Sequence, residues 1–349
     1  RQDASLQAGH FNDFVEVGLL RAALYRAAET AGNEGLRHES LTQAVFAALD
    51  LDVADYTADP DVKFQAANET RKALRDVLGY RLYIDQRRGW RITLPNLEQC
   101  GLLQTDYLSL EELCAAEEEW EGCHQLLVEA PPETRVTVAR TLLDWMRRAL
   151  AIKVDYLDGE FQERIRAQSN QRLRAPWDID DNEKMETATV VLPRSERRGD
   201  YGGHAYLSGR SGFGLYLNRQ STFPGHQQPL KTDERETIIR QLLEVLRVAG
   251  LVEVVLPAKE GDVPGYQVPA AAMVWKAGDG TKAFRDPLRM PQLPEEGGRT
   301  NDFFLAFYRR MAAGLKGFEA REHTAQVPYR LREEREERFR KGDLPILFC

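Results

Sequence analysis

The sequence lacks paired cysteines, long apolar runs and a positive net charge. Its four cysteines show no CxxC spacing, which argues against a zinc ribbon and a disulfide framework and indicates a reducing cytoplasm. No apolar run approaches the ~20 residues of a transmembrane helix and no signal peptide is present, so we expect a cytoplasmic protein without a membrane partner. The net charge of -8 excludes a basic coat over the whole chain, so any nucleic-acid surface must be a local patch.

The sequence also lacks a nucleotide-binding glycine loop. The glycine-rich segment 201–217 has no Lys-Ser or Lys-Thr pair at its end, which a phosphate-binding P-loop requires. We expect instead a β-rich, twisted segment in which glycines let backbones approach closely. The glutamates clustered in 111–119 indicate a solvated face or linker, and Cys123-His124 has no second pair to complete a metal site. We therefore predict no catalytic residue and no metal site in this chain.

Residues 1–100 contain a pattern of helices followed by a hairpin. The predicted elements are helices over 11–31, 40–49 and 59–78 and strands over 80–85 and 90–94. Ser40 with Gln43 is typical of a capping box, and Gly79 of a helix end. Three helices and a basic-tipped hairpin resemble a winged helix, in which the third helix is the recognition element and the hairpin is the wing.

The winged-helix resemblance implies contacts to nucleic acid from the third helix and from the wing. The implied contact residues are Asn68, Lys72 and Arg75 on the helix, and Arg87, Arg88 and Trp90 at the hairpin. Asparagine can pair with an adenine edge, and lysine or arginine with guanine or with phosphate. The alternatives are a solvated helix face and a solubilising turn, or a spacer that braces a motor. We favour backbone contact or scaffolding over base-specific reading.

Residues 101–185 are predicted to form a helical accessory region, with helices over 132–151 and 159–173. The end of the second helix carries Arg172, and Arg174 follows it, which gives a second candidate phosphate-binding patch. Pairing of the helix arginines with glutamates one turn away is the alternative explanation for these charges.

Residues 186–280 are predicted to form a β-rich segment that contains a second winged-helix-like unit. Its elements are a helix over 232–249 and strands over 251–256 and 265–275. For this unit we expect packing to be the main role and nucleic-acid contact a secondary one. Residues 281–300, rich in proline, glycine and charge, indicate a linker, and Asn301 caps a helix over 303–315.

The last stretch, 318–349, has the pattern strand, loop, charged helix, strand. The predicted elements are a strand over 320–324, a helix over 331–341 and a strand over 344–349. Gly342 occupies the position of a helix C-cap, and the apolar run after it is typical of a strand buried on both faces. Strand, helix and parallel strand make one crossover unit of an α/β sheet.

This stretch resembles the second RecA-like lobe of superfamily-2 DEAD/DEAH-box helicases. The matching residues are His323, Thr324 and Gln326 after the first strand, Arg335, Arg338, Phe339 and Gly342 in the helix, and Ile346, Leu347 and Phe348 in the last strand. The resemblance covers 301–349. It implies that His323, Thr324 and Gln326 lie at the carboxyl end of a strand and contact a nucleic-acid strand. For His323 the alternative is a structural histidine at a strand end.

Together these patterns predict a mixed α+β, helix-rich chain of winged-helix domains followed by a partial RecA-like segment. The predicted parts are 1–100, 101–185, 186–280, a linker over 281–300, and a truncated lobe over 301–349. Since the chain begins at Arg1 rather than Met and ends on a buried-type strand, we expect a piece of a longer protein, which the resemblance implies is a helicase. The resemblance implies ATP and Mg²⁺ as cofactors of the parent and none for this piece.

The expected partners are nucleic acid, DNA in preference to RNA, and the missing motor lobe of the same parent. Without that lobe the resemblance implies no ATP hydrolysis by this piece alone. Two alternative functions remain open on the sequence. The chain can be a winged-helix transcriptional regulator that reads one duplex sequence, or a protein-interaction scaffold, which the acidic net charge allows.

Overall fold

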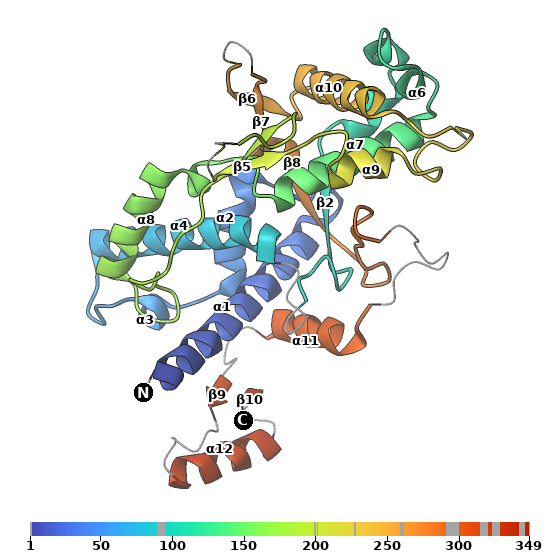
Figure 1. Ribbon diagram of the computed structural model, residues 1–349. Coiled ribbons are helices and arrows are strands. Elements are labelled where there is room, and N and C mark those ends of the chain that lie inside the picture. Colours follow the sequence, from blue (N-terminus) through green and yellow to red (C-terminus); the bar gives the residue numbers. More distant parts are fainter. Residues whose placement is uncertain are drawn as a thin grey trace.

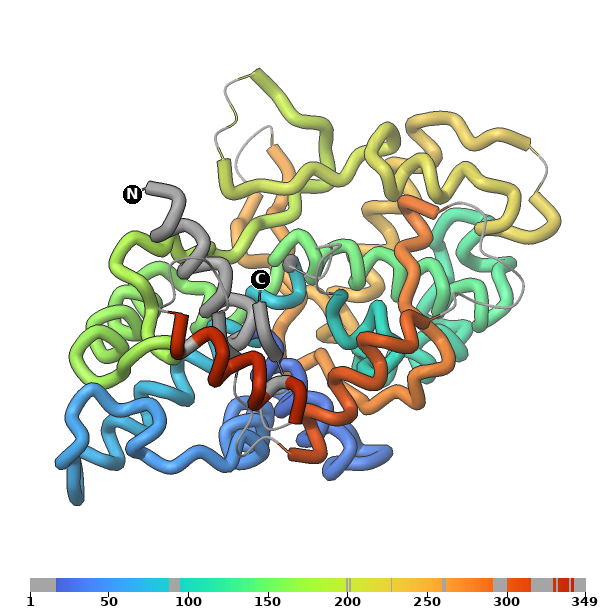
Figure 2. The backbone as a smooth tube through the Cα atoms, turned by 90° about the horizontal axis from the view of Figure 1, so that it is seen from below, coloured from blue at the N-terminus to red at the C-terminus, as the bar shows by residue number. Residues whose placement is uncertain are grey.

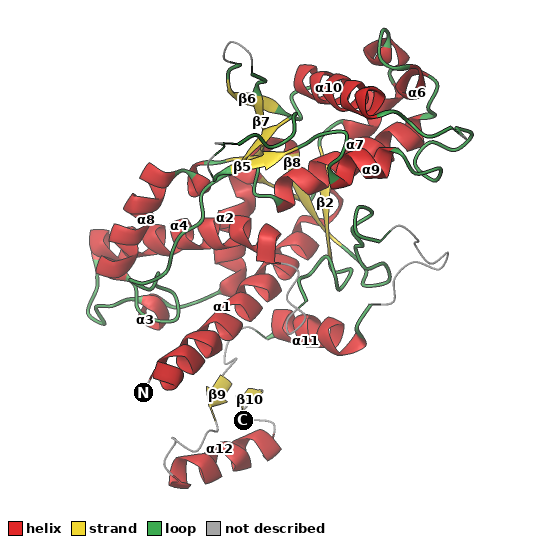
Figure 3. Cartoon of the chain, in the orientation of Figure 1, coloured by secondary structure: helices red, strands yellow, loops and turns green. Residues whose placement is uncertain are grey.

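The computed structural model describes residues 2–88, 95–198, 200, 202–226, 228–258, 262–290, 300–314, 320–322, 329–341 and 346–348. The fold is mixed α+β and helix-rich, with 54% helix and 11% strand, which confirms the predicted class. Figure 3 shows how helices surround the short strands near the centre of the molecule. Figure 2 shows the helices that follow residue 31 at one end and the segment around residue 230 at the other.

The N-terminal region is a stack of helices (Figure 1). It comprises α1 (Gln2–Ala31), α2 (His38–Leu49), α3 (Val53–Tyr56), α4 (Phe64–Arg88) and, from later in the chain, α8 (Gly159–Arg172). α2 packs on α1 and α4, and α8 packs on α4. The buried residues of α2 are Leu41, Val45 and Leu49, which recur at helical spacing and form the face turned toward this stack.

The predicted start of the second helix is wrong in its detail. α2 begins at His38, two residues before Ser40, and its N-cap residue Arg37 makes no side-chain capping bond. The Ser40 hydroxyl donates instead to the Arg37 carbonyl oxygen at 3.2 Å. The Ser40–Gln43 capping box is therefore absent, because Ser40 already lies within the first helical turn.

The predicted hairpin after residue 79 is also wrong in its first strand. Residues 80–85 belong to α4, which continues without a break through Gly79 to Arg88. A Cβ at Gly79 would lie 2.4 Å from the ring of Tyr156, so this glycine allows close packing rather than ending the helix. The helix is buried on most sides there: Tyr80, Leu82, Tyr83 and Ile84 are buried apolar residues, and the buried Arg81 forms an ion pair with Glu183. The second predicted strand, 90–94, lies outside the described residues.

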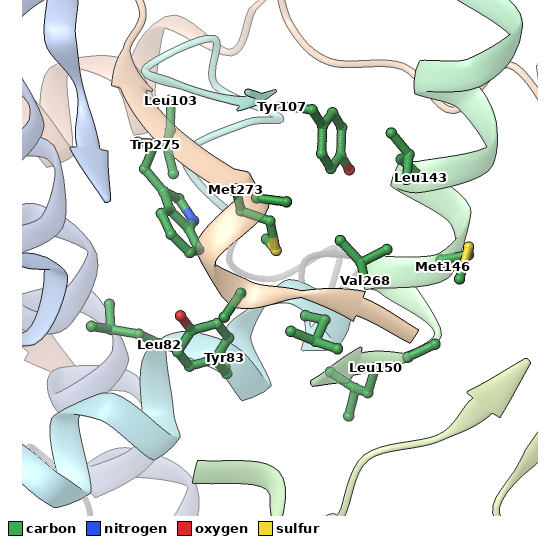
Figure 4. Close-up of a cluster of buried hydrophobic side chains, with 14 of the residues drawn as sticks. Leu82, Tyr83, Leu103, Tyr107, Leu143, Met146, Leu150, Val268, Met273 and Trp275 are labelled. Atoms are coloured by element: carbon green, nitrogen blue, oxygen red, sulfur yellow. The ribbon is translucent and has the colours of Figure 1, made fainter. Parts of the chain in front are cut away.

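The centre of the molecule is a three-stranded antiparallel sheet that packs against α1, with a second long helix beside one edge of the sheet. The strands are β1 (Leu36–Arg37), β8 (Met273–Ala277) and β2 (Leu103–Tyr107), in the order β1-β8-β2. The helix α7 (Pro132–Arg148) begins at the predicted residue and has proline at N1, and the short helices α5 (Leu110–Ala115) and α6 (Gln125–Val128) precede it. Figure 4 shows the core that α4, β2, α7, β7 and β8 build, with Trp275, Met273 and Met146 among its side chains.

A second, mixed sheet of five strands lies beside this core. Its order is β3 (Ile152–Lys153), β7 (Gly265–Pro269), β4 (Val190–Leu192) and β5 (His204–Tyr206), with β6 (Glu253–Leu256) also paired to β7. The predicted helix and hairpin of the second winged-helix-like unit are confirmed as elements. They are α10 (Thr232–Val248) and the antiparallel pair β6–β7. The predicted second strand, 265–275, is wrong in its length, because β7 ends at Pro269 and Met273–Ala277 forms β8 in the three-stranded sheet.

The glycine-rich segment is only partly the β-rich stretch that we predicted. β5 is a strand, but α9 (Gly212–Leu217) is a short helix capped by the Ser211 hydroxyl. A Cβ at Gly209 would lie 2.6 Å from the Thr232 carbonyl oxygen, and one at Gly214 would lie 2.4 Å from that of Ser208. Close backbone approach is therefore confirmed at these two positions.

The helix α11 (Asp302–Ala313) packs against α1 at the other end of the sequence. Asn301 caps it as predicted, since its side-chain oxygen accepts from the Phe303 amide at 3.1 Å. Arg21 of α1 is buried and donates to the Tyr308 hydroxyl at 3.0 Å and to Asp85 of α4 at 2.6 Å. These contacts fix α11 to the N-terminal helices.

The C-terminal elements form the predicted crossover unit. β9 (Ala320–Glu322) pairs in parallel with β10 (Ile346–Phe348), and α12 (Tyr329–Lys341) connects them in sequence. Strand, helix and parallel strand are therefore confirmed in the predicted order. Figure 1 draws this unit at the lower end of the molecule, below α11.

Candidate nucleic-acid interface

The outer face of α4 carries three of the predicted contact residues. Thr70, Leu74 and Val77 point into the helical stack and are at most 1% exposed. Asn68 and Lys72, one turn apart, are exposed on the opposite face. Arg75, one turn further, is half-buried and donates to the Gln43 side-chain oxygen of α2 at 2.7 Å. The amphipathic spacing of α4 thus separates a packing face from a polar stripe.

The end of α8 brings Arg172 beside this stripe. Asp158 caps α8, since its carboxylate accepts from the Phe161 amide at 3.0 Å, and the helix then runs along α4. The Arg172 guanidinium forms an ion pair with Glu69 of α4 and also donates to Gln168 at 2.9 Å. Arg172 therefore lies at the predicted patch, but a carboxylate partly neutralises its charge.

Arg174 lies beyond the end of α8 and retains its charge. Its amide donates to the Tyr56 carbonyl oxygen at 3.0 Å, next to the isolated β-bridge between Thr57 and Leu173. Its guanidinium donates to the Ala54 carbonyl oxygen at 2.7 Å, and the side chain is exposed. A carbonyl acceptor orients the guanidinium without cancelling its charge, so Arg174 can still contact an anion.

We name these residues the α4–α8 patch; its members are Asn68, Arg71, Lys72, Arg75, Arg172 and Arg174. Arg71 is exposed and donates to the Asn68 side-chain oxygen at 2.8 Å, which orients the amide. Among the described residues, Lys72 and Arg174 have no carboxylate within ion-pair distance. The patch thus offers cations and one oriented amide over the surfaces of two packed helices.

Asp76 lowers the positive charge beside the patch. Burial raises the pKa of its carboxyl, although nearby Lys72, Arg75 and Arg164 act in the opposite direction. A half-buried carboxylate whose pKa is raised despite three cations is poorly solvated in its charged form. The charge of Asp76 therefore opposes anion binding here, and its removal offers a test.

Other predicted contact residues are not part of this patch. Arg87 lies about 28 Å along α4 from Asn68, at about 1.5 Å per residue, and it forms an ion pair with Glu186. Arg88 is the last residue of α4. The remaining ones lie outside the described residues, so their predicted roles stay predictions; they are Trp90, His323, Thr324 and Gln326.

Two residues near the patch were not among the predicted contacts. Arg71 follows Asn68 by three residues, a spacing that places both on one helix face. Phe64 is the first residue of α4, and its apolar side chain is 88% exposed. Its backbone is in the left-handed region at φ 52°, which begins α4 four residues after Pro60 and turns the ring outward. Sequence periodicity gives no signal for this reversal.

Other kinds of site have less support in the part of the chain that the structure describes. No three or more His, Cys, Asp or Glu side chains gather there as a metal site would require. None of the helices described has the length and apolar character needed to cross a membrane. Burial raises the pKa of the Cys100 thiol to about 11, which disfavours a reactive thiolate. Comparisons with family models, curated proteins and solved structures find no match to this chain.

Proposed function

We propose that this chain is part of an ATP-dependent nucleic-acid helicase or translocase of superfamily 2. In this proposal it supplies accessory nucleic-acid contacts and part of the second RecA-like lobe. The observation that carries the proposal is the parallel pairing of β9 with β10 across α12, in the order that the resemblance predicts. Parallel strands need a crossover connection, and RecA-like lobes are built from such units.

Two further observations support a nucleic-acid role. The α4–α8 patch presents Lys72 and Arg174 without carboxylate partners among the described residues, as phosphate contacts require. The β9 strand ends at Glu322, so the sequence places His323, Thr324 and Gln326 directly after its carboxyl end. Ligands of open α/β sheets bind at the carboxyl ends of the β-strands. In this proposal, these three residues contact one strand of the nucleic acid.

The cofactor ATP and its Mg²⁺ belong, in this proposal, to the complete motor rather than to this chain. The nucleotide-binding lysine loop and the acidic Mg²⁺ motif are assigned to the first lobe of the parent. We therefore expect the chain to bind nucleic acid, DNA in preference to RNA, without hydrolysing ATP. ATP hydrolysis by the purified chain would contradict the assignment of its residues to the second lobe.

Fluorescence anisotropy with labelled oligonucleotides tests the proposal. Single strands or forked DNA should bind in preference to blunt duplex, with little dependence on base sequence. The logarithm of the association constant should fall with the logarithm of salt concentration by roughly 0.7 per phosphate contacted on a single strand. Absence of binding at low salt would leave the interaction scaffold as the better account.

A winged-helix regulator is the second candidate function, and α10 with the β6–β7 pair favours it. This helix is followed directly by an antiparallel hairpin, as in a winged helix. A regulator differs from a motor piece in preferring one duplex sequence over others by several orders of magnitude. Competition between unrelated duplexes of equal length in the same anisotropy assay separates the two functions.

A further inference from the structure

A cavity of about 640 Å³ lies between β2, α7 and the segment that follows β8. Its walls include Thr105 of β2, Arg140 and Arg147 of α7, and Lys282 and Arg285 after β8. None of these residues belongs to the α4–α8 patch. The volume lies within the range of sites that hold small ligands.

The floor of the cavity is a buried network of ion pairs and hydrogen bonds. Arg147 is 1% exposed and donates to Glu98 at 2.7 Å and to Asp144 at 2.9 Å. The Thr105 hydroxyl donates to Glu98 at 3.0 Å. The adjacent Arg148 supplies a second positive charge that also acts on Glu98. Because Arg147 donates to both carboxylates and Thr105 donates to one of them, the floor is an ordered, hydrogen-bonded network whose carboxylates are engaged.

The rim carries an excess of positive charge. Arg140 lies 2.5 Å from Asp106, but Lys276 lies 3.0 Å from the same carboxylate, so one anion serves two cations. Within the described ranges, Lys282 and Arg285 have no carboxylate at ion-pair distance. The Asp279 carboxylate on the same segment accepts from the amide and hydroxyl of Thr281 at 2.8 and 2.6 Å, which orients the carboxylate without cancelling its charge. The rim therefore has two carboxylates, Asp106 and Asp279, against four cations: Arg140, Lys276, Lys282 and Arg285.

The segment that carries the rim is held in place by backbone hydrogen bonds. The Gly280 amide donates to the Gly101 carbonyl oxygen at 2.9 Å, and the Phe284 amide donates to that of Glu98 at 2.8 Å. These bonds fix the backbone around Lys282 before any ligand arrives. Preorganised cations lose less entropy on binding than cations on a free loop.

Phe284 is the aromatic residue among the described residues that line the cavity, and the Arg148 guanidinium already lies over its ring. The Arg148 guanidinium carbon lies 3.8 Å from the centre of the Phe284 ring, and Arg148 also pairs with Asp286 at 3.3 Å. A base cannot stack on the face that Arg148 covers. The lining therefore favours recognition of anionic oxygens by cations over recognition of a base by an aromatic ring.

We propose that this cavity binds a phosphate group, which Lys282, Arg285 and Arg140 contact above the buried network of the floor. The phosphate belongs either to a small phosphorylated ligand or to a nucleic-acid backbone. The site goes beyond the proposed function, because a free phosphate ligand requires neither a motor lobe nor the α4–α8 patch. If substitutions in the α4–α8 patch leave oligonucleotide binding unchanged, phosphate binding by this cavity can still be tested independently.

The test measures two probes against matched variants. Inorganic pyrophosphate in calorimetric titrations represents the small ligand, and a labelled single-stranded oligonucleotide in anisotropy represents the backbone. The K282A/R285A variant should bind at least one probe roughly tenfold more weakly, since a charged hydrogen bond to the ligand is worth that order of affinity. The R210A/R240A variant removes the same charge from exposed arginines outside the lining and should bind both probes like wild type.

A second substitution tests the cavity without removing either cation, so the result does not depend on the folding of K282A/R285A. Gln104 is exposed on β2 and lines the same cavity, so Q104E places a negative charge there without truncating a cation. It should weaken the same probe, with an unchanged thermal unfolding midpoint. A response of pyrophosphate supports a small ligand, and a response of the oligonucleotide alone supports a backbone phosphate. Equal binding of both probes by K282A/R285A, Q104E and R210A/R240A would overturn the proposal.

Discussion

Arg147 in the buried network under the cavity and Arg174 in the exposed α4–α8 patch show two different uses of an arginine side chain. Arg147 is 1% exposed and donates to Glu98 and Asp144, so its charge is consumed inside the protein. Arg174 is exposed and donates to a backbone carbonyl, so its charge remains available. The comparison shows that partner chemistry, rather than the number of arginines, separates structural charge from charge that can bind a ligand. The predictions below test this division.

The largest expected effect is on the structural side. Replacing Arg147 by methionine leaves Glu98 and Asp144 buried without their cation, which should destabilise the fold by about 3–5 kcal/mol. Urea unfolding followed by circular dichroism measures the loss. The triple variant E98Q/D144N/R147M removes the stranded charges and should regain part of the stability. No recovery in the triple variant would mean that packing, rather than charge pairing, gives Arg147 its role.

The same network should make the fold sensitive to acid. Burial alone would raise the pKa of Glu98, but Arg147 and Arg148 lower it below the ordinary value of 4.5. A carboxyl with a lowered folded-state pKa adds stability above pH 4.5, and that stability is lost as the pH falls through the folded-state pKa. Unfolding free energy measured from about pH 6 to about pH 3 should fall less steeply in E98Q than in wild type.

The sequence predicts much of the helical fold because its apolar residues recur at helical spacing. α7, α10 and α11 appear where the pattern places them, as do the helix and both strands of the C-terminal unit. These elements depend on contacts of one face with a core, and a period of 3.6 or a short apolar run records that face. Local spacing is therefore enough to find them.

Residues 80–88 show where local spacing fails. The alternating pattern of 80–85 predicted a strand, yet α4 continues to Arg88 because its neighbours enclose it on several sides and bury Tyr80, Leu82, Tyr83 and Ile84. Gly79 looks like a helix end in sequence, but it accommodates the Tyr156 ring from a distant element. A contact between residues so far apart in the chain leaves no mark in either local sequence.

The candidate interface was predictable only in part for the same reason. Helical spacing places Asn68, Lys72 and Arg75 on one side of α4. It cannot predict that the arginine at the end of α8 pairs with a glutamate of α4, or that Arg174 donates to the Ala54 carbonyl oxygen. Those partners result from the packing of α8 and α3 beside α4. That packing decides whether a carboxylate or a carbonyl oxygen lies next to each guanidinium, and so whether its charge is neutralised.

The next largest effect is on binding. The K72A/R174A variant removes two cations that have no carboxylate partner among the described residues, so oligonucleotide affinity should fall about tenfold or more. The slope of log affinity for a single-stranded oligonucleotide against log salt should decrease by roughly 0.7 for each phosphate that the variant no longer neutralises. Because both side chains are exposed, stability should change by less than about 0.5 kcal/mol.

The matched control for this variant is K153A/R247A. It removes the same charge from exposed side chains that already pair with Glu253 and Glu244. If partner chemistry decides availability, the control should bind oligonucleotide almost like wild type. Equal loss of affinity in the two variants would show that net charge alone governs binding and would erase the distinction between paired and unpaired cations.

The smallest expected effect is a gain from Asp76→Asn. Burial raises the pKa of Asp76 above its ordinary value of 3.8 although Lys72, Arg75 and Arg164 lower it. A raised folded-state pKa means that this carboxylate costs stability as the pH rises through the folded-state value, so the amide should be slightly more stable at neutral pH. It should also strengthen oligonucleotide binding, by less than about tenfold, because one opposing charge leaves the patch.

Asp178→Asn separates the gain in stability from the gain in oligonucleotide affinity. The pKa of Asp178 is also raised by burial, but this residue lies outside the α4–α8 patch. D178N should therefore raise stability at neutral pH in the same direction as D76N and leave oligonucleotide affinity unchanged. A gain in affinity in both variants would assign the effect to overall charge, whereas a gain in D76N alone would locate the bound phosphates beside Lys72 and Arg75.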